Sequence, residues 1–191
     1  MKQLSKTASH GLFVALLALM LATRFHHFGT ALHLPDASMV IFFLGGLYLR
    51  KHCQFAVFVV LAGVIDWAAI SLAGGSDFCV TPAYSFLLPA YAVLWSGGRL
   101  YADRLQMTWK SVLGAFAVAL VSASLSFAIS NGAFYWLGGR YTDTNFAEYV
   151  ARAWEWGPLF VRTTMAYIAG AAIVHALIVR VLAARETGAR A

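Results

Sequence analysis

Long apolar segments separated by short polar loops are the feature that most restricts how this chain can fold. Six such segments can be drawn in the 191 residues, at 9–23, 36–49, 55–72, 82–95, 109–137 and 158–184. Hydrophobic residues make up 61% of the chain and charged residues 12%, which leaves too little polar surface to coat a soluble globule. Barrel strands would alternate apolar and polar residues over about half these lengths. The sequence therefore predicts an all-α membrane protein, a bundle of six transmembrane helices that forms one domain over residues 1–191.

The basic residues predict the orientation of these helices, because loops that hold Lys and Arg tend to remain cytoplasmic. Ten of the 14 Lys and Arg residues fall at the termini or around the second and fourth loops. Three belong to the other loops, and Arg162 lies inside the last segment. We expect cytoplasmic N and C termini and an outer side that carries the loops around His27, Cys79 and Tyr141. A cleaved signal peptide over the first segment is an alternative that leaves the later topology unchanged. The net charge of +6 follows from this distribution and does not indicate nucleic-acid binding.

The two cysteines are predicted to be free thiols. Cys53 would start the third helix at the cytoplasmic face, whereas Cys79 would lie beyond its outer end, across about 30 Å of hydrocarbon, which is too far for a disulfide. Cys53 is interpreted as a small packing residue. Cys79 is either covered by its neighbours in the same way or has a chemical task, since an unpaired thiol is a liability in an oxidising compartment.

The outer loops are unusually rich in aromatic residues, and the second and fourth segments, at 14 residues each, are short for a span. Non-helical backbone is tolerated at membrane depth only where protein covers it or where it lines a cavity. We therefore expect an outward-facing cavity capped by aromatic loops, with an interfacial aromatic belt as the alternative. Residues 145–156 are predicted to form a short amphipathic helix, supported by the charges of Glu148, Arg152 and Glu155, that acts as a lid.

Asp66 is the main ionisable residue inside a predicted helix, and a carboxylate in hydrocarbon usually faces a polar cavity or a charged partner. Cys79 and Tyr84 follow it within one loop, so all three residues can share one cavity wall. The alternatives are a buried ion pair of Asp66 with Arg152 or Arg162 and an ordinary packing role for Tyr84.

A further cluster is predicted in the first outer loop, which holds His26, His27 and His33. Together with Cys79 these residues offer nitrogen and sulfur ligands that suit a soft or borderline transition-metal ion. Histidines beside a helix end are also common interfacial residues, and that interpretation stays open for each of them.

Several motifs are missing from the sequence. It contains no G-x-x-x-x-G-K-[ST], C-x-x-C, H-E-x-x-H or G-x-S-x-G pattern, each of which would indicate a specific chemistry. We therefore expect that the chain does not hydrolyse ATP itself. It would depend on an external motor, on passive binding and release, or on chemistry that traps a bound ligand.

Three features occur in order along the chain: Asp66 near the end of the third segment, the loop Asp77-Phe78-Cys79-Val80-Thr81-Pro82, and then Tyr84. With these features the chain resembles the BtuM family of cobalamin transporters. That family is found in Gram-negative bacteria and is related to the substrate-binding S-components of energy-coupling-factor (ECF) transporters. The resemblance covers the whole chain in length and topology, and its specific part runs from residue 66 to residue 84.

The resemblance implies uptake of cobalamin (vitamin B12) across the bacterial inner membrane, with the corrin in a periplasm-facing cavity. Cys79 would be the axial thiolate ligand of cobalt and the residue responsible for reductive removal of cyanide from cyanocobalamin. Asp66 and Tyr84 would line the corrin pocket, and Phe78, His27 and Arg152 would also contact it. An ECF-type energising module would dock on the first helix, where Ala18 and Ala22 have a small-x-x-x-small spacing, or the protein would act alone.

Two other classes of function remain open at this point. One is an S-component-like importer of another vitamin or of a bare transition-metal ion. The metal-ion importer would use His26, His27, His33 and Cys79 as its site, although nickel and cobalt S-components begin with Met-His and this chain begins Met1-Lys2. A non-transport membrane subunit would use its buried charges only for pairing. Bound cobalamin would colour the purified protein red, which separates the first hypothesis from both alternatives.

Overall fold

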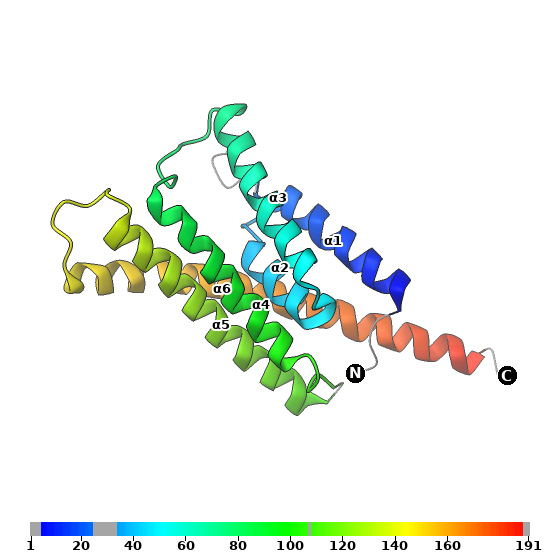
Figure 1. The fold of residues 1–191 in the computed structure, drawn as a ribbon. Coiled ribbons are helices and arrows are strands. Elements are labelled where there is room, and N and C mark those ends of the chain that lie inside the picture. Colours follow the sequence, from blue (N-terminus) through cyan, green and yellow to red (C-terminus); the bar gives the residue numbers. More distant parts are fainter. Residues whose placement is uncertain (1–4, 25–33, 107, 189–191) are drawn as a thin grey trace.

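The computed structural model describes residues 5–24, 34–106 and 108–188, and within these ranges all regular secondary structure is helical (Figure 1). The elements in chain order are α1 (Lys6–Arg24), α2 (Ser38–Leu44) with the π turn η2 (Gly45–Leu49), α3 (His52–Ser71), the 3₁₀ turn η3 (Pro82–Phe86), α4 (Leu87–Tyr101), α5 (Trp109–Leu137) and α6 (Phe146–Gly188). α1, α3, α5 and α6 are long and apolar enough to cross a membrane. The chain is thus a multi-pass membrane protein by the length and composition of its helices.

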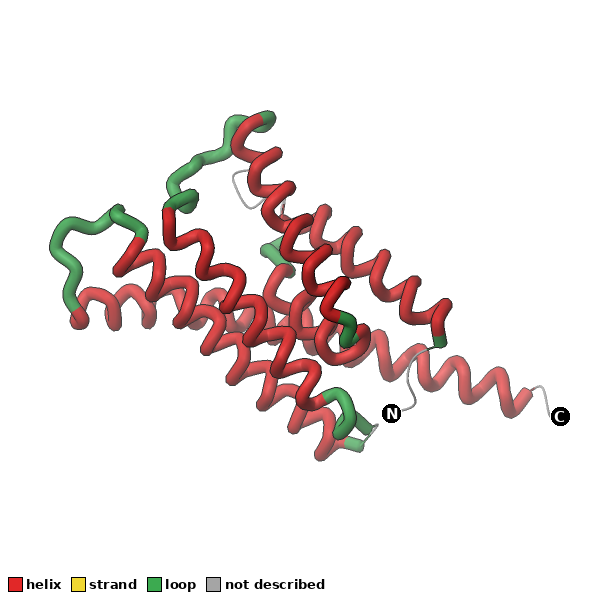
Figure 2. Tube along the Cα trace, in the orientation of Figure 1, coloured by secondary structure: helices red, strands yellow, loops and turns green. Residues whose placement is uncertain are grey.

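The helices run alternately up and down the bundle, so the connections gather at its two ends (Figure 2). The α3–η3 and α5–α6 loops lie at one end, which we call the loop end. The α2–α3 and α4–α5 turns lie at the other, together with the start of α1 and the last turns of α6. We call this the basic end, because its turns carry Arg50, Lys51 and Arg104.

α2 and η2 form the centre of the bundle and contact helices on every side. α2 packs against α1, α3, α4, α5 and α6, and the side chains of Val40, Ile41 and Phe42 are no more than 1% exposed. α2 and η2 are thus surrounded by protein, and together they are too short to span a hydrocarbon core about 30 Å thick. The sequence predicted this short second segment correctly.

Glycines allow α4 to approach this central element closely. A Cβ atom at Gly98 would lie 2.1 Å from the carbonyl oxygen of Phe43, and one at Gly46 would lie 2.0 Å from that of Trp95. No side chain fits such gaps, and close backbone approach at small residues is the usual way in which membrane helices pack. The fourth helix consequently continues to Tyr101, beyond the end at residue 95 that the sequence predicted.

The outer surface of the bundle is apolar, in contrast to that of a soluble protein. Val60 and Val64 on α3, Val121 on α5 and Ile173 on α6 are all more than half exposed. Exposed apolar surface of this extent normally faces another apolar phase. The arrangement therefore supports embedding in a lipid bilayer.

Candidate functional site

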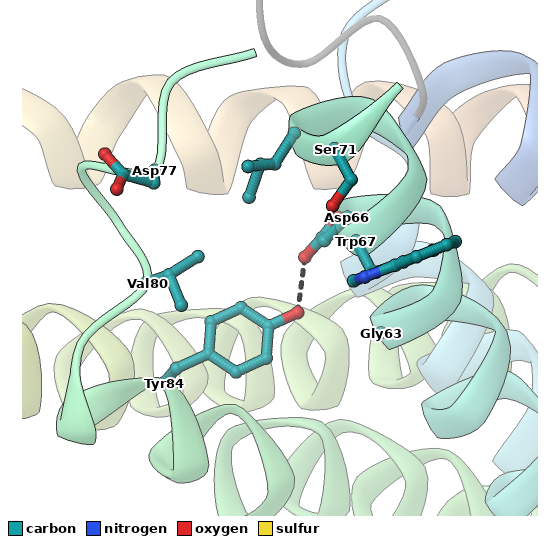
Figure 3. Close-up of a pocket in the computed structure, with 8 residues that line it drawn as sticks. Gly63, Asp66, Trp67, Ser71, Asp77, Val80 and Tyr84 are labelled. Atoms are coloured by element: carbon teal, nitrogen blue, oxygen red, sulfur yellow. Dashed lines mark hydrogen bonds between the residues drawn. The ribbon is translucent and has the colours of Figure 1, made fainter. Parts of the chain in front are cut away.

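A pocket of about 310 Å³ opens at the loop end between α3, the α3–η3 loop and η3. In Figure 3, Asp77, Val80 and Tyr84 form one side and Gly63, Asp66, Trp67 and Ser71 of α3 form the other. The Tyr84 hydroxyl points across the pocket and donates a hydrogen bond to Asp66 Oδ2 at 2.5 Å. The structure thus brings Asp66 and Tyr84 together across one pocket. The sequence predicted that these two residues and Cys79 would share one cavity wall, and Cys79 is not among the residues that line it.

Asp66 is held from the opposite side by Arg24, at the end of α1. Arg24 Nε donates to Asp66 Oδ1 at 2.7 Å and Nη2 donates to Oδ2 at 2.6 Å, a bidentate pair, and both residues are buried. The predicted alternative, an ion pair of Asp66 with Arg152 or Arg162, is therefore wrong about the partner. Arg24 directly follows residue 23, the end of the first predicted segment, so its sequence position indicates a loop residue and not a buried partner of Asp66.

The remaining donors of Arg24 tie three further groups to this pair. Arg24 Nη1 donates to Ser38 Oγ and to the Tyr91 hydroxyl, each at 2.8 Å, and lies 3.5 Å from Asp36 Oδ2. Asp36 in turn accepts hydrogen bonds from the backbone and side chain of Ser38. The Arg24 network therefore joins α1, α2, α3, η3 and α4 at the loop end, and it satisfies a guanidinium that would be costly to bury unpaired.

Cys79 lies at the tip of a tight turn on the rim of this pocket. The backbone amide of Val80 donates to the Asp77 carbonyl at 2.8 Å, so Phe78 and Cys79 occupy the two central turn positions. Asp77 and Val80 line the pocket, whereas Cys79 itself does not and is exposed. The pKa of the Cys79 thiol is raised above its ordinary value, mainly because burial removes water from the thiolate. The negative charge of Asp66 adds to this rise, and the positive charge of Arg140 opposes it.

Arg140, a residue that the sequence analysis did not single out, fastens this turn to the α5–α6 loop. Its Nε donates to the Phe78 carbonyl oxygen at 3.1 Å, and its guanidinium carbon lies 5.1 Å from the centre of the Phe78 ring. The Phe78 ring also packs against Phe134 of α5, with 5.6 Å between ring centroids. Phe78 thus anchors the turn to α5 and to the α5–α6 loop. Arg140 and Phe78 are 62 residues apart, so no local sequence pattern predicts the contact between them.

Arg152 lies in a separate aromatic cluster on α5, the α5–α6 loop and the first turns of α6. Its guanidinium stacks 4.5 Å from the centre of the Tyr141 ring, and Tyr141 packs against Tyr135 at 5.0 Å. Arg152 does not line the pocket, and its Nε is buried without a hydrogen-bond partner in the structure. The aromatic residues of this loop pack on one another beside the pocket and do not cap it.

The predicted lid helix is also corrected by the structure. Residues 146–156 are helical, but they form the first turns of the continuous helix α6, which passes through Pro158. Glu148 accepts a hydrogen bond from the Tyr135 hydroxyl at 3.0 Å, so this carboxylate fixes the start of α6 against α5. A separate, freely hinged lid is therefore not what these residues form.

The predicted metal ligands of the first outer loop cannot be placed, since His26, His27 and His33 lie outside the described residues. Within 5–24, 34–106 and 108–188, no three His, Cys, Asp or Glu side chains gather closely enough to hold a metal ion. Cys79 is next in sequence to Val80, which lines the pocket together with Asp66 and Tyr84.

The site combines an exposed thiol, a partly polar pocket and a buried charged network at one end of an apolar bundle. This arrangement can bind a ligand that offers a thiol-binding centre and hydrogen-bonding edges. A comparison with protein-family models finds no match for the chain, and a search among curated proteins finds none either.

Proposed function

We propose that the protein takes up cobalamin across the bacterial inner membrane, with Cys79 as the axial ligand of cobalt. The observation that supports this best is the position of Cys79 at the tip of the Asp77–Val80 turn, on the rim of the pocket that contains Asp66 and Tyr84. A thiol in this position can approach the centre of a flat ligand while polar side chains contact its edge. Cobalamin has both parts, a central cobalt and a fringe of amides.

The chemistry proposed for Cys79 begins with loss of its proton, because the thiolate is the metal-binding form. Sulfur donation from one face of the corrin weakens the bond to cyanide on the opposite face. A one-electron reductant then converts cobalt(III) to cobalt(II), and cyanide leaves with its electron pair. The protein's part is to place the sulfur on the cobalt axis, and an added reductant supplies the electron.

Binding of a whole corrin requires the pocket to widen. The present volume of about 310 Å³ lies at the lower end of the range for drug-sized ligands, roughly 300–1,000 Å³, and cobalamin is larger than these. We propose that the α3–η3 loop moves outward to admit the ring. The loop is held by the hydrogen bond from Arg140 to the Phe78 carbonyl oxygen and by the packing of the Phe78 ring against Phe134. The turn η3 that follows it is held by the hydrogen bond from Tyr84 to Asp66.

Transport then depends on a change of access that this chain either undergoes alone or completes with an ECF-type energising module. Ala18 and Ala22 are exposed on α1, so the small-residue face that a coupling subunit would contact is open. A growth assay in a host that lacks its own inner-membrane cobalamin transporter separates the two cases, if it is run with and without such a module.

The proposal is tested by replacing Cys79 with Ser and following the corrin absorption spectrum of the purified protein with cyanocobalamin and a reductant. Cys53→Ser is the matched control, because it removes the other thiol at the opposite end of the bundle. We expect the control to bind corrin and to release cyanide, and the Cys79 variant to lose both the spectral shift of sulfur ligation and cyanide release. Undiminished activity of Cys79→Ser would refute the ligand role, and absence of corrin binding by the unaltered protein would refute the function.

A further inference from the structure

A second hollow lies on the outer surface between α4 and α5, away from the pocket of Asp66 and Tyr84. We call that first pocket the thiol pocket, because Cys79 lies beside it. It has a volume of about 720 Å³, and its floor lies where Gly97 meets Ser122, since a Cβ at Gly97 would be 2.1 Å from Ser122 Oγ. We call it the α4–α5 groove. Its lining is apolar apart from two serines and consists of Pro89, Ala92, Val93, Ser96, Gly97 and Leu100 of α4 and Ala117, Val118, Val121, Ser122 and Leu125 of α5.

The length of the α4–α5 groove limits what can occupy it. Along α4 it runs from Pro89 to Leu100, eleven residue steps or about 16 Å at 1.5 Å each. That is about half of a hydrocarbon core roughly 30 Å thick, so the groove covers one leaflet only. A transmembrane helix of a partner would need a seam through both leaflets, whereas one acyl chain of a phospholipid fits a seam of this length.

The groove ends at the basic end of the bundle, where two cations lie beyond it. Lys110 is seven residues before Ala117 on α5, nearly two turns, and therefore lies on the same helix face about 10 Å farther along. Arg104 lies in the α4–α5 turn, and both side chains are exposed. Lys110 Nζ is 5.8 Å from the centre of the Trp109 ring, and exposed tryptophan is typical of the headgroup level of a membrane.

The other charged residues near this turn already have partners at the α2–α3 turn. Asp103 accepts a hydrogen bond from Arg50 at 2.8 Å, and Arg99 contacts the Arg50 carbonyl oxygen and His52. Among the described residues around the turn and in the first turn of α5, Arg104 and Lys110 are the cations that have no such partner in the structure. The charge beyond the groove is therefore positive and complements an anionic headgroup.

From these observations we infer that the α4–α5 groove is a binding site for one anionic phospholipid. One acyl chain lies in the groove, and the phosphate of the headgroup contacts Arg104 and Lys110. The site is separate from the thiol pocket, and the inference does not depend on the proposed transport of cobalamin.

The test measures binding of dioleoylphosphatidylglycerol and dioleoylphosphatidylcholine to the delipidated full-length protein by native mass spectrometry. Ser96→Leu with Ala117→Leu fills the groove, and Arg104→Gln with Lys110→Gln removes its cations. The matched controls are Gly170→Leu, which adds bulk at an exposed position of α6 with no atom within 4 Å of the new Cβ, and Lys51→Gln, which removes an exposed cation on the α2–α3 turn.

We expect one tightly bound phosphatidylglycerol, at least about tenfold weaker binding after groove filling, and about fivefold weaker binding for each cation removed. Both controls should bind phosphatidylglycerol as the unaltered protein does.

Equal binding by all variants would overturn the inference. Weaker binding of the cation variant alone, with no effect of groove filling, would also overturn it, because it would indicate general surface attraction. A dimer that groove filling abolishes would also overturn it, because the occupant would then be a second copy of the chain. Corrin binding by the groove variants, read from absorption, should be unchanged and reports separately on the thiol pocket.

Discussion

Arg24 is the residue on which the loop end of the bundle depends most. Its guanidinium binds both oxygens of Asp66 and also reaches Ser38 and Tyr91. Removing one partner of a buried pair leaves an uncompensated charge, whereas removing both does not. The network is therefore more sensitive to the loss of Arg24 alone than to the loss of the pair.

We predict that Arg24→Met lowers the free energy of unfolding by about 3–5 kcal/mol and that Arg24→Met combined with Asp66→Asn lowers it by clearly less. The measurement is thermal or denaturant unfolding of the purified protein in detergent. Lys110→Gln serves as a control, since this exposed cation has no buried partner and should change stability little. A double variant less stable than Arg24→Met would contradict the charge argument.

Ionisation of Cys79 gives a prediction about pH. The pKa of this thiol is raised above its ordinary value, so it is protonated at neutral pH, and cobalt ligation must release the proton. We expect corrin affinity to rise about tenfold per pH unit and to level off once the pH passes the thiol pKa, as followed by absorption titration. Arg140→Gln removes a charge that lowers this pKa, so it should move the levelling point to higher pH. An affinity independent of pH would indicate that sulfur ligation does not contribute.

The packing of α4 on the central element explains why some helix boundaries were predicted and others were not. The bounds of α5 match the sequence prediction at both ends, because a long apolar run fixes them. The end of α4 was placed too early, because Ser96-Gly97-Gly98-Arg99 has the composition of a turn. The glycines instead remain helical and admit the backbone of α2 and η2. In the same way, no local pattern connects Arg24 with Asp66 or Arg140 with Phe78, since these pairs form only when separate helices meet.

Gly98→Ala tests this packing directly. The new methyl group would meet the Phe43 carbonyl oxygen at 2.1 Å and the Leu47 amide nitrogen at 2.8 Å, and neither backbone group can move alone. We expect a loss of about 1–3 kcal/mol in unfolding free energy from overpacking, measured in detergent. Gly170→Ala, where nothing lies within 4 Å, should be neutral or slightly stabilising. Equal stability of both variants would show that α4 can shift away from α2.

The whole molecule is polarised along its axis, with basic turns at one end and the thiol pocket at the other. Because loops rich in Lys and Arg tend to remain cytoplasmic, the pocket is proposed to face the periplasm. The two cysteines report on this orientation, since Cys53 lies in the first turn of α3 beside the basic turns, Cys79 lies at the loop end, and both are exposed.

We predict that a membrane-impermeant maleimide added to intact spheroplasts labels Cys79 and leaves Cys53 unlabelled until the membrane is permeabilised. Cys53→Ser and Cys79→Ser variants assign each signal to one thiol, and labelling after permeabilisation confirms that both thiols are reactive. The reverse pattern would place the pocket on the cytoplasmic side. Uptake through a periplasm-facing pocket would then be refuted, although the Arg24 network and the α4–α5 groove would stand, because neither depends on which side of the membrane the loop end faces.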